Sequence, residues 1–179
     1  MPADHPAKPA LPLLLVAALL PGVAQALVVP IPEKVLQARV REQFPLTRRM
    51  PLGIDVELAN PVVSLAGQDG RVGLALDAAV GLPSQPVVSG RADVSGLVRF
   101  EPAQSRFVLD DPRLEALQLP GVPPAYAGAV RAAVNAAASS LLRSLPLYTL
   151  DTGSFAESYA KRHLKSVRVK EGRLLLEFE

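Results

Sequence analysis

The chain has no cysteine, no tryptophan and only two histidines among its 179 residues. Without cysteine there is no disulfide, no thiol nucleophile, no cysteine-based metal site and no acyl anchor on a lipobox cysteine. His5 and His163 leave few positions for metal binding or general-base chemistry. The stability of the fold must therefore come from the burial of apolar side chains.

The chain also has little excess of basic residues and few aromatic side chains, two features on which nucleic-acid binding depends. The chain has 19 basic and 17 acidic residues, and its aromatic residues are 3 Tyr and 5 Phe. Proteins that bind nucleic acid usually combine a dense basic stripe with aromatic stacking platforms. The composition therefore predicts that nucleic acid is not a partner. Apolar residues form 49% of the chain, which is enough for a core.

Residues 1–26 are typical of an export signal. Lys8 precedes an apolar run at residues 11–20, a Pro-Gly pair ends the run, and residues 24–26 read Ala-Gln-Ala, a cleavage site. The run is about half of the ~20 residues that a membrane-spanning helix needs. We expect a cleaved signal peptide at 1–26, one domain at 27–179 and a soluble periplasmic product. An uncleaved anchor or a buried N-terminal helix remains the alternative.

A short helix is expected first, followed by a long run of strands. Pro32 suits a first helical position, and Leu36, Val40 and Phe44 form one apolar stripe that Pro45 ends. From residue 46 to 119 the apolar period is two, with turn residues at 68–70, 83–86 and 101–104. Asn60-Pro61 reads as a bulge or an edge position. Four long strands with one apolar face predict an antiparallel meander.

The C-terminal part predicts a long helix and a closing hairpin. Residues 124–144 include eight alanines. The stripe that would face the sheet is made of Tyr126, Val130, Val134, Ala137, Leu141 and Leu145. A short strand at 147–150, a third helix capped by Ser154 and Glu157, and a hairpin at 167–178 follow. The fold class is α+β, with a long curled antiparallel meander around the long helix.

The face between this helix and the sheet allows two interpretations. Gly90 and Gly96 lie on the apolar face of the third long strand, opposite a helix rich in alanine and valine. They can relieve strand curvature in a closely packed core. Alternatively, small side chains leave an elongated apolar groove for a ligand. The residues that would line such a groove are Leu76, Val94, Val98, Val130, Val134 and Leu141.

Several segments, taken together, resemble the YceB-like family of bacterial periplasmic lipoproteins and secreted proteins of unknown biochemical role. The matching segments are Leu36 through Pro45, Ala59-Asn60-Pro61, Leu141 to Leu150, and Tyr159-Ala160-Lys161 with Val167 to Glu177. The resemblance covers residues 33–179. It implies the architecture of the tubular lipid-binding superfamily, relatives of bactericidal permeability-increasing protein, in which apolar ligands lie between a long helix and a curled sheet. The lipoproteins of the family carry a cysteine after the signal, which this chain lacks.

The residues that could carry chemistry favour structural roles. Asp110 and Asp111 are neighbours in a predicted strand that Asp111-Pro112 interrupts. Their carboxylates should point to opposite faces, and the pair should form a bulge or turn before Pro112. His163 is surrounded by cations, and no nucleophile elbow, Walker A motif or dinucleotide fingerprint is present. The sequence therefore predicts no enzyme activity, no catalytic residue, no metal site and no cofactor.

A run of cations near the C-terminus is either a solvated face or a contact with anionic lipid headgroups. It comprises Lys161, Arg162, Lys165, Arg168 and Lys170. With the groove and the resemblance, it leads us to expect an exported binder of lipid or another apolar ligand. The alternative is a protein-interaction or envelope-assembly module with a solid core.

The signal prediction can be tested by mass. When the gene is expressed in a Gram-negative host, the protein recovered from the periplasm should have the intact mass of a 153-residue chain that begins at Leu27. A full-length chain retained in the membrane fraction would instead support the uncleaved anchor.

Overall fold

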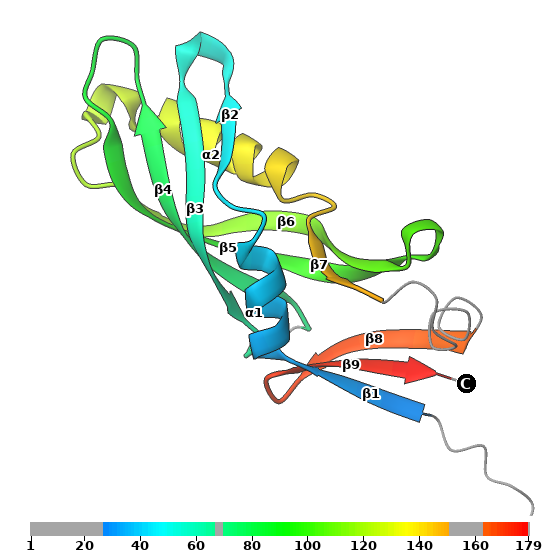
Figure 1. The fold of residues 1–179 in the computed structure, drawn as a ribbon. Helices are drawn as coiled ribbons and strands as arrows, with labels where there is room; N and C mark the ends of the chain where they lie inside the picture. The colour runs from blue at the N-terminus through cyan, green and yellow to red at the C-terminus, as the bar shows by residue number, and fades with distance from the viewer. Residues whose placement is uncertain (1–26, 67–69, 151–162, 179) are drawn as a thin grey trace, which may run out of the picture.

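A computed structural model describes residues 27–66, 70–150 and 163–178 of the chain (Figure 1). These residues form a six-stranded sheet, a three-stranded sheet and two α-helices, and all strand pairs are antiparallel. The elements are β1 (Leu27–Pro32), α1 (Glu33–Arg41), β2 (Leu46–Arg49), β3 (Asp55–Ser64), β4 (Val72–Gly81), β5 (Val88–Glu101), β6 (Arg106–Gln118), α2 (Ala127–Leu141), β7 (Pro146–Thr149), β8 (Leu164–Lys170) and β9 (Arg173–Phe178).

The six-stranded sheet is the predicted meander with one short strand added at each edge. Its order is β2-β3-β4-β5-β6-β7, so every neighbour in space is a neighbour in sequence. Figure 1 shows the sheet curling so that α2 lies against one face at its upper end. Alternate residues of β4 point into the core, as the period of two predicts: Val72, Leu74, Leu76, Ala78 and Val80 are each at most 1% exposed. The antiparallel α+β architecture is thus confirmed.

Several register shifts interrupt the pairing of the long strands, and two of them include a residue with positive φ. The predicted bulge at Asn60-Pro61 is confirmed, because the register of β3 and β4 shifts there and Asn60 has φ +48°. The bulge or turn expected before Pro112 is confirmed as a bulge, whereas the expected interruption of the strand there is wrong. β6 continues through it, because Asp111, with φ +44°, is absorbed as an extra residue in the pairing with β5.

The residues before α1 form a strand, β1, where the sequence predicts that Pro30-Ile31-Pro32 opens a helix. Residues 27–32 are extended and pair with β9, with Ile31 opposite Leu174 and only 5% exposed. β1 is an edge strand, so it tolerates two prolines that cannot donate hydrogen bonds. Helix α1 therefore begins at Glu33, with Pro32 outside it as the N-cap.

Helix α1 covers the edge of β3 that β2 leaves unpaired, on the side opposite β4. β2 pairs only with residues 55–58 of β3. Beyond the bulge, Gln37 Nε2 donates to the Pro61 carbonyl at 2.7 Å, and Gln37 Oε1 accepts from the Val63 amide at 2.7 Å. Glu33 accepts from the Leu65 amide at 2.9 Å. Side chains of α1 thus replace the missing strand, while Leu36 and Val40 enter the core as predicted.

Helix α2 is shorter than the predicted 124–144. A 3₁₀ turn (Pro124–Tyr126) leads into it, and it ends at Leu141. Ser144 and Leu145 leave the helical path because their backbone groups bond to Leu109 of β6. The buried face consequently shifts from the predicted stripe: Leu142 is buried in place of Leu141, and Tyr126 is 42% exposed.

The two inward glycines make room for β6. A Cβ on Gly90 would lie 1.9 Å from the Gln118 carbonyl oxygen, and a Cβ on Gly96 would lie 2.5 Å from Leu109 Cγ. Both positions therefore serve close packing between strands. They do not widen a groove beneath α2.

The C-terminal hairpin of β8 and β9 is confirmed, with Glu171 (φ +53°) and Gly172 (φ +70°) in its turn. The short strand predicted at 147–150 is present as β7. The signal peptide, most of the 68–70 turn and the helix predicted from Ser154 lie outside the described residues.

Replacing Gln37 with leucine tests the strand-replacing role of α1. Gln37→Leu leaves the Val63 amide and the Pro61 carbonyl without partners, so we expect the free energy of unfolding to fall by ~2 kcal/mol. Lys34→Leu, on the exposed side of the same helix, should change it by no more than ~0.5 kcal/mol. Urea unfolding followed by circular dichroism measures both. Equal midpoints for the two variants would contradict this role.

Candidate functional site

An apolar cleft lies along one flank of α2. One wall is the turn between β2 and β3, with Met50, Pro51, Leu52 and Ile54. The other is a row of alanines on the helix: Ala129, Ala132, Ala133 and Ala136. Its volume is about 280 Å³, near the lower end of the ~300–1,000 Å³ of small-molecule sites. Every lining side chain is apolar, so the cleft suits a hydrocarbon chain and offers no group for acid–base chemistry.

The cleft exists because alanine side chains are short. On the face of α2 that meets the sheet, Val130 and Val134 close the gap and are at most 2% exposed. Nearly half a turn around the helix, at about 140–180° from the mean direction of the two valines, Ala132 and Ala136 are exposed and do not fill the space beside the 50–54 turn. Leu52 stands at this turn with φ +65° and is 80% exposed, so it shapes the cleft without filling it.

A smaller cleft lies on the opposite flank of α2. It has a volume of about 220 Å³ and is lined by Leu117, Leu119, Val122, Ala127, Val130 and Arg131. The helix α2 therefore has a hollow on each flank, one lined by apolar residues alone and one that also includes Arg131.

The six residues predicted to line a groove belong to the core and its edge. Leu76, Val94, Val130 and Val134 are each at most 2% exposed. These four side chains expose too little surface for a tunnel to run along all of them. Val98 and Leu141 are partly buried and pack against the same core. Of the six, Val130 alone also lines a cleft described above. A ligand role for the set stays a prediction, and it requires α2 to move away from the sheet.

The sequence did not point to the 50–54 turn as part of a site. The available signal was a five-residue stretch without charge, Met-Pro-Leu-Gly-Ile, between Arg49 and Asp55. Its position beside the alanines of α2 depends on tertiary packing that periodicity does not encode.

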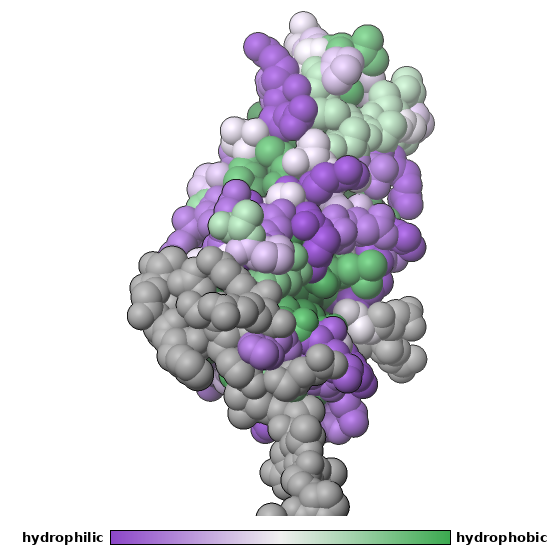
Figure 2. Space-filling view, turned by 90° about the vertical axis from the view of Figure 1, so that its right-hand side faces the viewer, coloured by the Kyte–Doolittle hydropathy of each residue, from purple (hydrophilic) through white to green (hydrophobic). Residues whose placement is uncertain are grey.

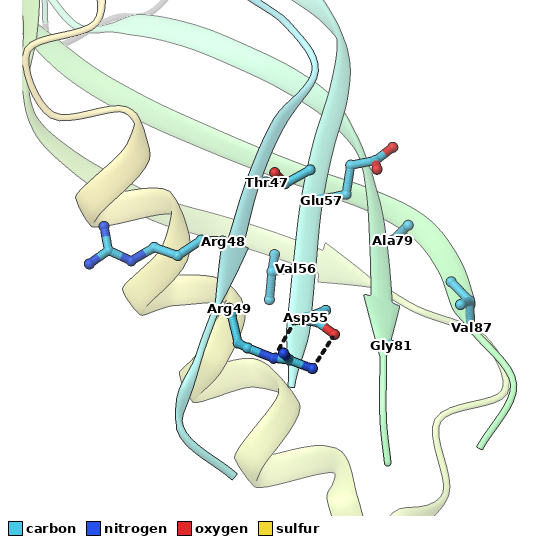
Figure 3. Close-up of a pocket in the computed structure, with 9 residues that line it drawn as sticks. All are labelled: Thr47, Arg48, Arg49, Asp55, Val56, Glu57, Ala79, Gly81 and Val87. Carbon is cyan, nitrogen blue, oxygen red and sulfur yellow. Dashed lines mark hydrogen bonds and ion pairs between the residues drawn. The ribbon is translucent and has the colours of Figure 1, made fainter. Parts of the chain in front are cut away.

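The outer face of the sheet carries a larger but more polar depression of about 450 Å³ (Figure 3). Within it, Arg49 Nε forms an ion pair with Asp55 Oδ1 at 3.2 Å, and Glu57 is also part of the lining. The charges here are exposed and close to one another, which makes the depression a solvated sheet surface. Arg48 points away from this pair, on the side where α2 runs (Figure 3).

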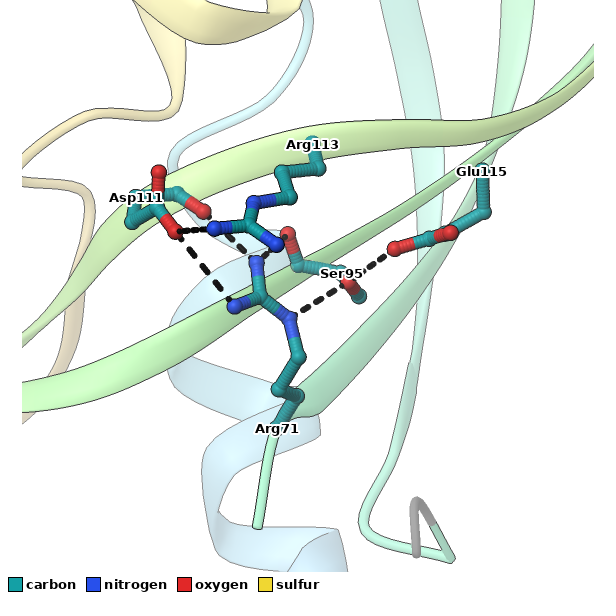
Figure 4. Close-up of polar contacts among 5 residues, drawn as sticks. All are labelled: Arg71, Ser95, Asp111, Arg113 and Glu115. Carbon is teal, nitrogen blue, oxygen red and sulfur yellow. Dashed lines mark hydrogen bonds and ion pairs between the residues drawn. The ribbon is translucent and has the colours of Figure 1, made fainter. Parts of the chain in front are cut away.

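A polar network ties the second bulge to two neighbouring strands (Figure 4). Arg71 donates to Ser95 Oγ at 2.8 Å and to the Asp111 carbonyl at 2.7 Å, and its guanidinium pairs with the Asp111 carboxylate at 3.5 Å. Arg113 approaches the same carboxylate at 2.6 Å, and Ser95 Oγ donates to Glu115. Each charged group has a partner within the network, which is typical of a structural role.

Comparison with known proteins gives one family. A sequence model described as "Protein of unknown function (DUF1439)" matches residues 31–173. The match runs from the end of β1 to the first residue of β9 and so includes the whole six-stranded sheet, both described helices and β8. The chain belongs to the DUF1439 family. No curated protein matches it.

In this DUF1439 chain the aspartate pair is held by arginines. Asp110 pairs with Arg99 at 3.3 Å, and Asp111 pairs with Arg71 and Arg113. The expectation that the two carboxylates point to opposite faces is wrong, because the bulge turns both toward the outer face. Each carboxylate nevertheless meets different arginines.

The one titration shift resolved among the described side chains also has a structural cause. The hydrogen bond from Arg106 Nε at 2.8 Å lowers the pKa of the Glu101 carboxyl, and Arg99 acts in the same direction. Within the described ranges, no three His, Cys, Asp or Glu side chains gather as metal ligands would. Neither described helix is long and apolar enough to cross a membrane.

Lys165, Arg168 and Lys170 of the C-terminal cations lie on β8 of the small sheet, which Figure 1 shows at the opposite end of the molecule from α2. Arg168 pairs with Glu177 at 2.8 Å, and Lys170 pairs with Glu171 at 3.8 Å. Lys161 and Arg162 lie outside the described residues. Contact of this run with an anionic membrane stays a prediction.

Proposed function

We propose that this protein binds a lipid or another apolar ligand without catalysis, and that the apolar cleft between the 50–54 turn and α2 is where the ligand enters. The observation that carries the proposal is the lining of the cleft, which has eight apolar residues and no charged one. Its volume of about 280 Å³ matches a single acyl chain better than a whole diacyl lipid.

The packing of α2 supports a site that can enlarge. The helix meets the sheet through small side chains, of which Ala133, Val134 and Ala137 are at most 7% exposed. Each buried methylene contributes only about 0.8 kcal/mol, so alanine contacts hold a helix less strongly than leucine contacts. Lifting α2 would join the clefts on its two flanks and expose the predicted floor residues Leu76 and Val94.

The expected location and ancestry agree with this role. The signal-like segment at 1–26 supports an exported, periplasmic protein. The resemblance to the YceB-like family implies the architecture of the tubular lipid-binding superfamily, whose members hold apolar ligands between a helix and a curled sheet. Since fold alone does not define function, these likenesses support the proposal only together with the cleft.

A second candidate is a protein-interaction or envelope-assembly module with a solid core. The closed packing under α2 favours it, because Leu76, Val94 and Val134 are at most 2% exposed. In that case the purified protein carries no lipid, and crosslinking in cells recovers one stable protein partner.

Filling the cleft tests the proposed function. Ala132 and Ala136 line it and are exposed, so phenylalanine at either position occupies the cleft without entering the core. We expect Ala132→Phe and Ala136→Phe to weaken binding of the apolar dye N-phenyl-1-naphthylamine about tenfold, equivalent to ~1.4 kcal/mol. Dye fluorescence measures the affinity, and native mass spectrometry checks for co-purified lipid.

The matched control is Asn135→Phe, which adds the same ring on the same helix outside the cleft lining. It should leave dye binding unchanged. A wild-type protein that binds neither dye nor lipid, or a control that weakens binding as much as the cleft variants, would overturn the proposal.

A further inference from the structure

Three segments without a single charged residue meet at one end of the molecule. They are residues 50–54, 82–87 and 119–128. In Figure 1 they lie together at the top, at the opposite end from β1, β8 and β9. The first two touch, since a Cβ on Gly53 would lie 3.3 Å from Pro83 Cγ. Residues 119–128 reach the other two segments through α2. One cleft lies between α2 and residues 50–54, and the other lies between α2 and residues 117–122. We call these three segments the uncharged end.

The uncharged end exposes large apolar side chains. Leu52 is 80% exposed and Val87 is 66% exposed, the two highest values among the large apolar side chains of the described residues. Tyr126, 42% exposed, adds an aromatic ring with a polar tip. The top of Figure 2 shows apolar and weakly polar surface beside one strongly hydrophilic group at its left. Burying these side chains in water-free surroundings would be favourable.

Cations outnumber anions among the unpaired charges that border this end, where Glu57, three positions from Ile54, is the one anion of the described residues without a partner. Arg49 pairs with Asp55, and Arg91 pairs with Asp93. Arg48 and Arg131 have no hydrogen-bond or ion-pair partner among the described residues, and each stands within three positions of an uncharged segment. An apolar surface bordered by unpaired cations is complementary to a layer of anionic headgroups above hydrocarbon.

We propose that the uncharged end docks on the surface of a bilayer that contains anionic lipid. Leu52 and Val87 enter the boundary between headgroups and acyl chains, and Tyr126 lies at the headgroup level, where aromatic rings with polar tips are favoured. Arg48 and Arg131 meet the headgroup phosphates, and each cation near an anionic surface contributes favourably. Both α2 clefts flank this end, so docking would bring them to the lipid. Docking and ligand binding are separate properties and can be tested separately.

The absence of tryptophan from the chain gives a direct test. Leu52→Trp creates a protein with a single tryptophan at the tip of the uncharged end. Vesicles of phosphatidylethanolamine and phosphatidylglycerol should shift its emission to shorter wavelength, and neutral phosphatidylcholine vesicles should do so less. Val62→Trp is the matched control, because Val62 is also exposed, at 54%, but lies on β3 away from this end. Its emission should not change.

Vesicle sedimentation measures the same contact without a reporter. Leu52→Gln should lower the vesicle partition coefficient about tenfold, and Arg48→Gln with Arg131→Gln should lower it only for anionic vesicles at low salt. Val62→Gln should have no effect.

Three outcomes would overturn the proposal. The first is an emission spectrum of the Leu52→Trp variant that anionic vesicles leave unchanged. The second is vesicle binding that depends on Lys165, Arg168 and Lys170 instead of the uncharged end. The third is a shift in the emission of the Leu52→Trp variant without vesicles, accompanied by a doubled mass in sedimentation, which would assign the surface to a second copy of the chain.

Discussion

The contact between α2 and the inner face of the curled sheet determines most of what is distinctive in this molecule. The helix offers the sheet valine and alanine, so its axis approaches closely and Val134 is fully buried. The same short side chains fall short of the 50–54 turn and of residues 117–122, which leaves an apolar hollow on each flank. Tight packing beneath the helix and open clefts beside it therefore have one cause.

Polar side chains keep the sheet in the shape that this contact requires. The bulges of β3 and β6 leave backbone groups that need partners. Gln37 binds the backbone beyond the β3 bulge, and Arg71 binds the carbonyl of Asp111 at the β6 bulge. Both are long side chains from outside the bulged strand. They hold the curvature without adding volume to the core.

The sequence predicted the elements whose apolar period is regular and failed where tertiary contacts decide. The meander, the bulge at Asn60 and the closing hairpin follow from alternation and turn residues that act locally. β1 was missed because its residues 27–32 carry two prolines just ahead of a helix, and only pairing with the distant β9 makes them a strand. The predicted groove residues include true core positions such as Leu76 and Val134. The cleft itself could not be predicted, because it depends on how the turn at Leu52 packs against α2 in the tertiary structure.

The central claim, that a hydrocarbon chain enters the space beside the alanines of α2, is tested most directly by nuclear magnetic resonance of alanine methyl groups. Uniformly labelled alanine methyls report on Ala129, Ala132, Ala133 and Ala136 in the cleft and on Ala75 and Ala79 on the outer face of β4. On titration with dodecanoate, the account predicts shifts and intermolecular contacts for the cleft alanines and none for the β4 pair. Shifts confined to Ala75 and Ala79, or no shifts at saturating ligand, would contradict it.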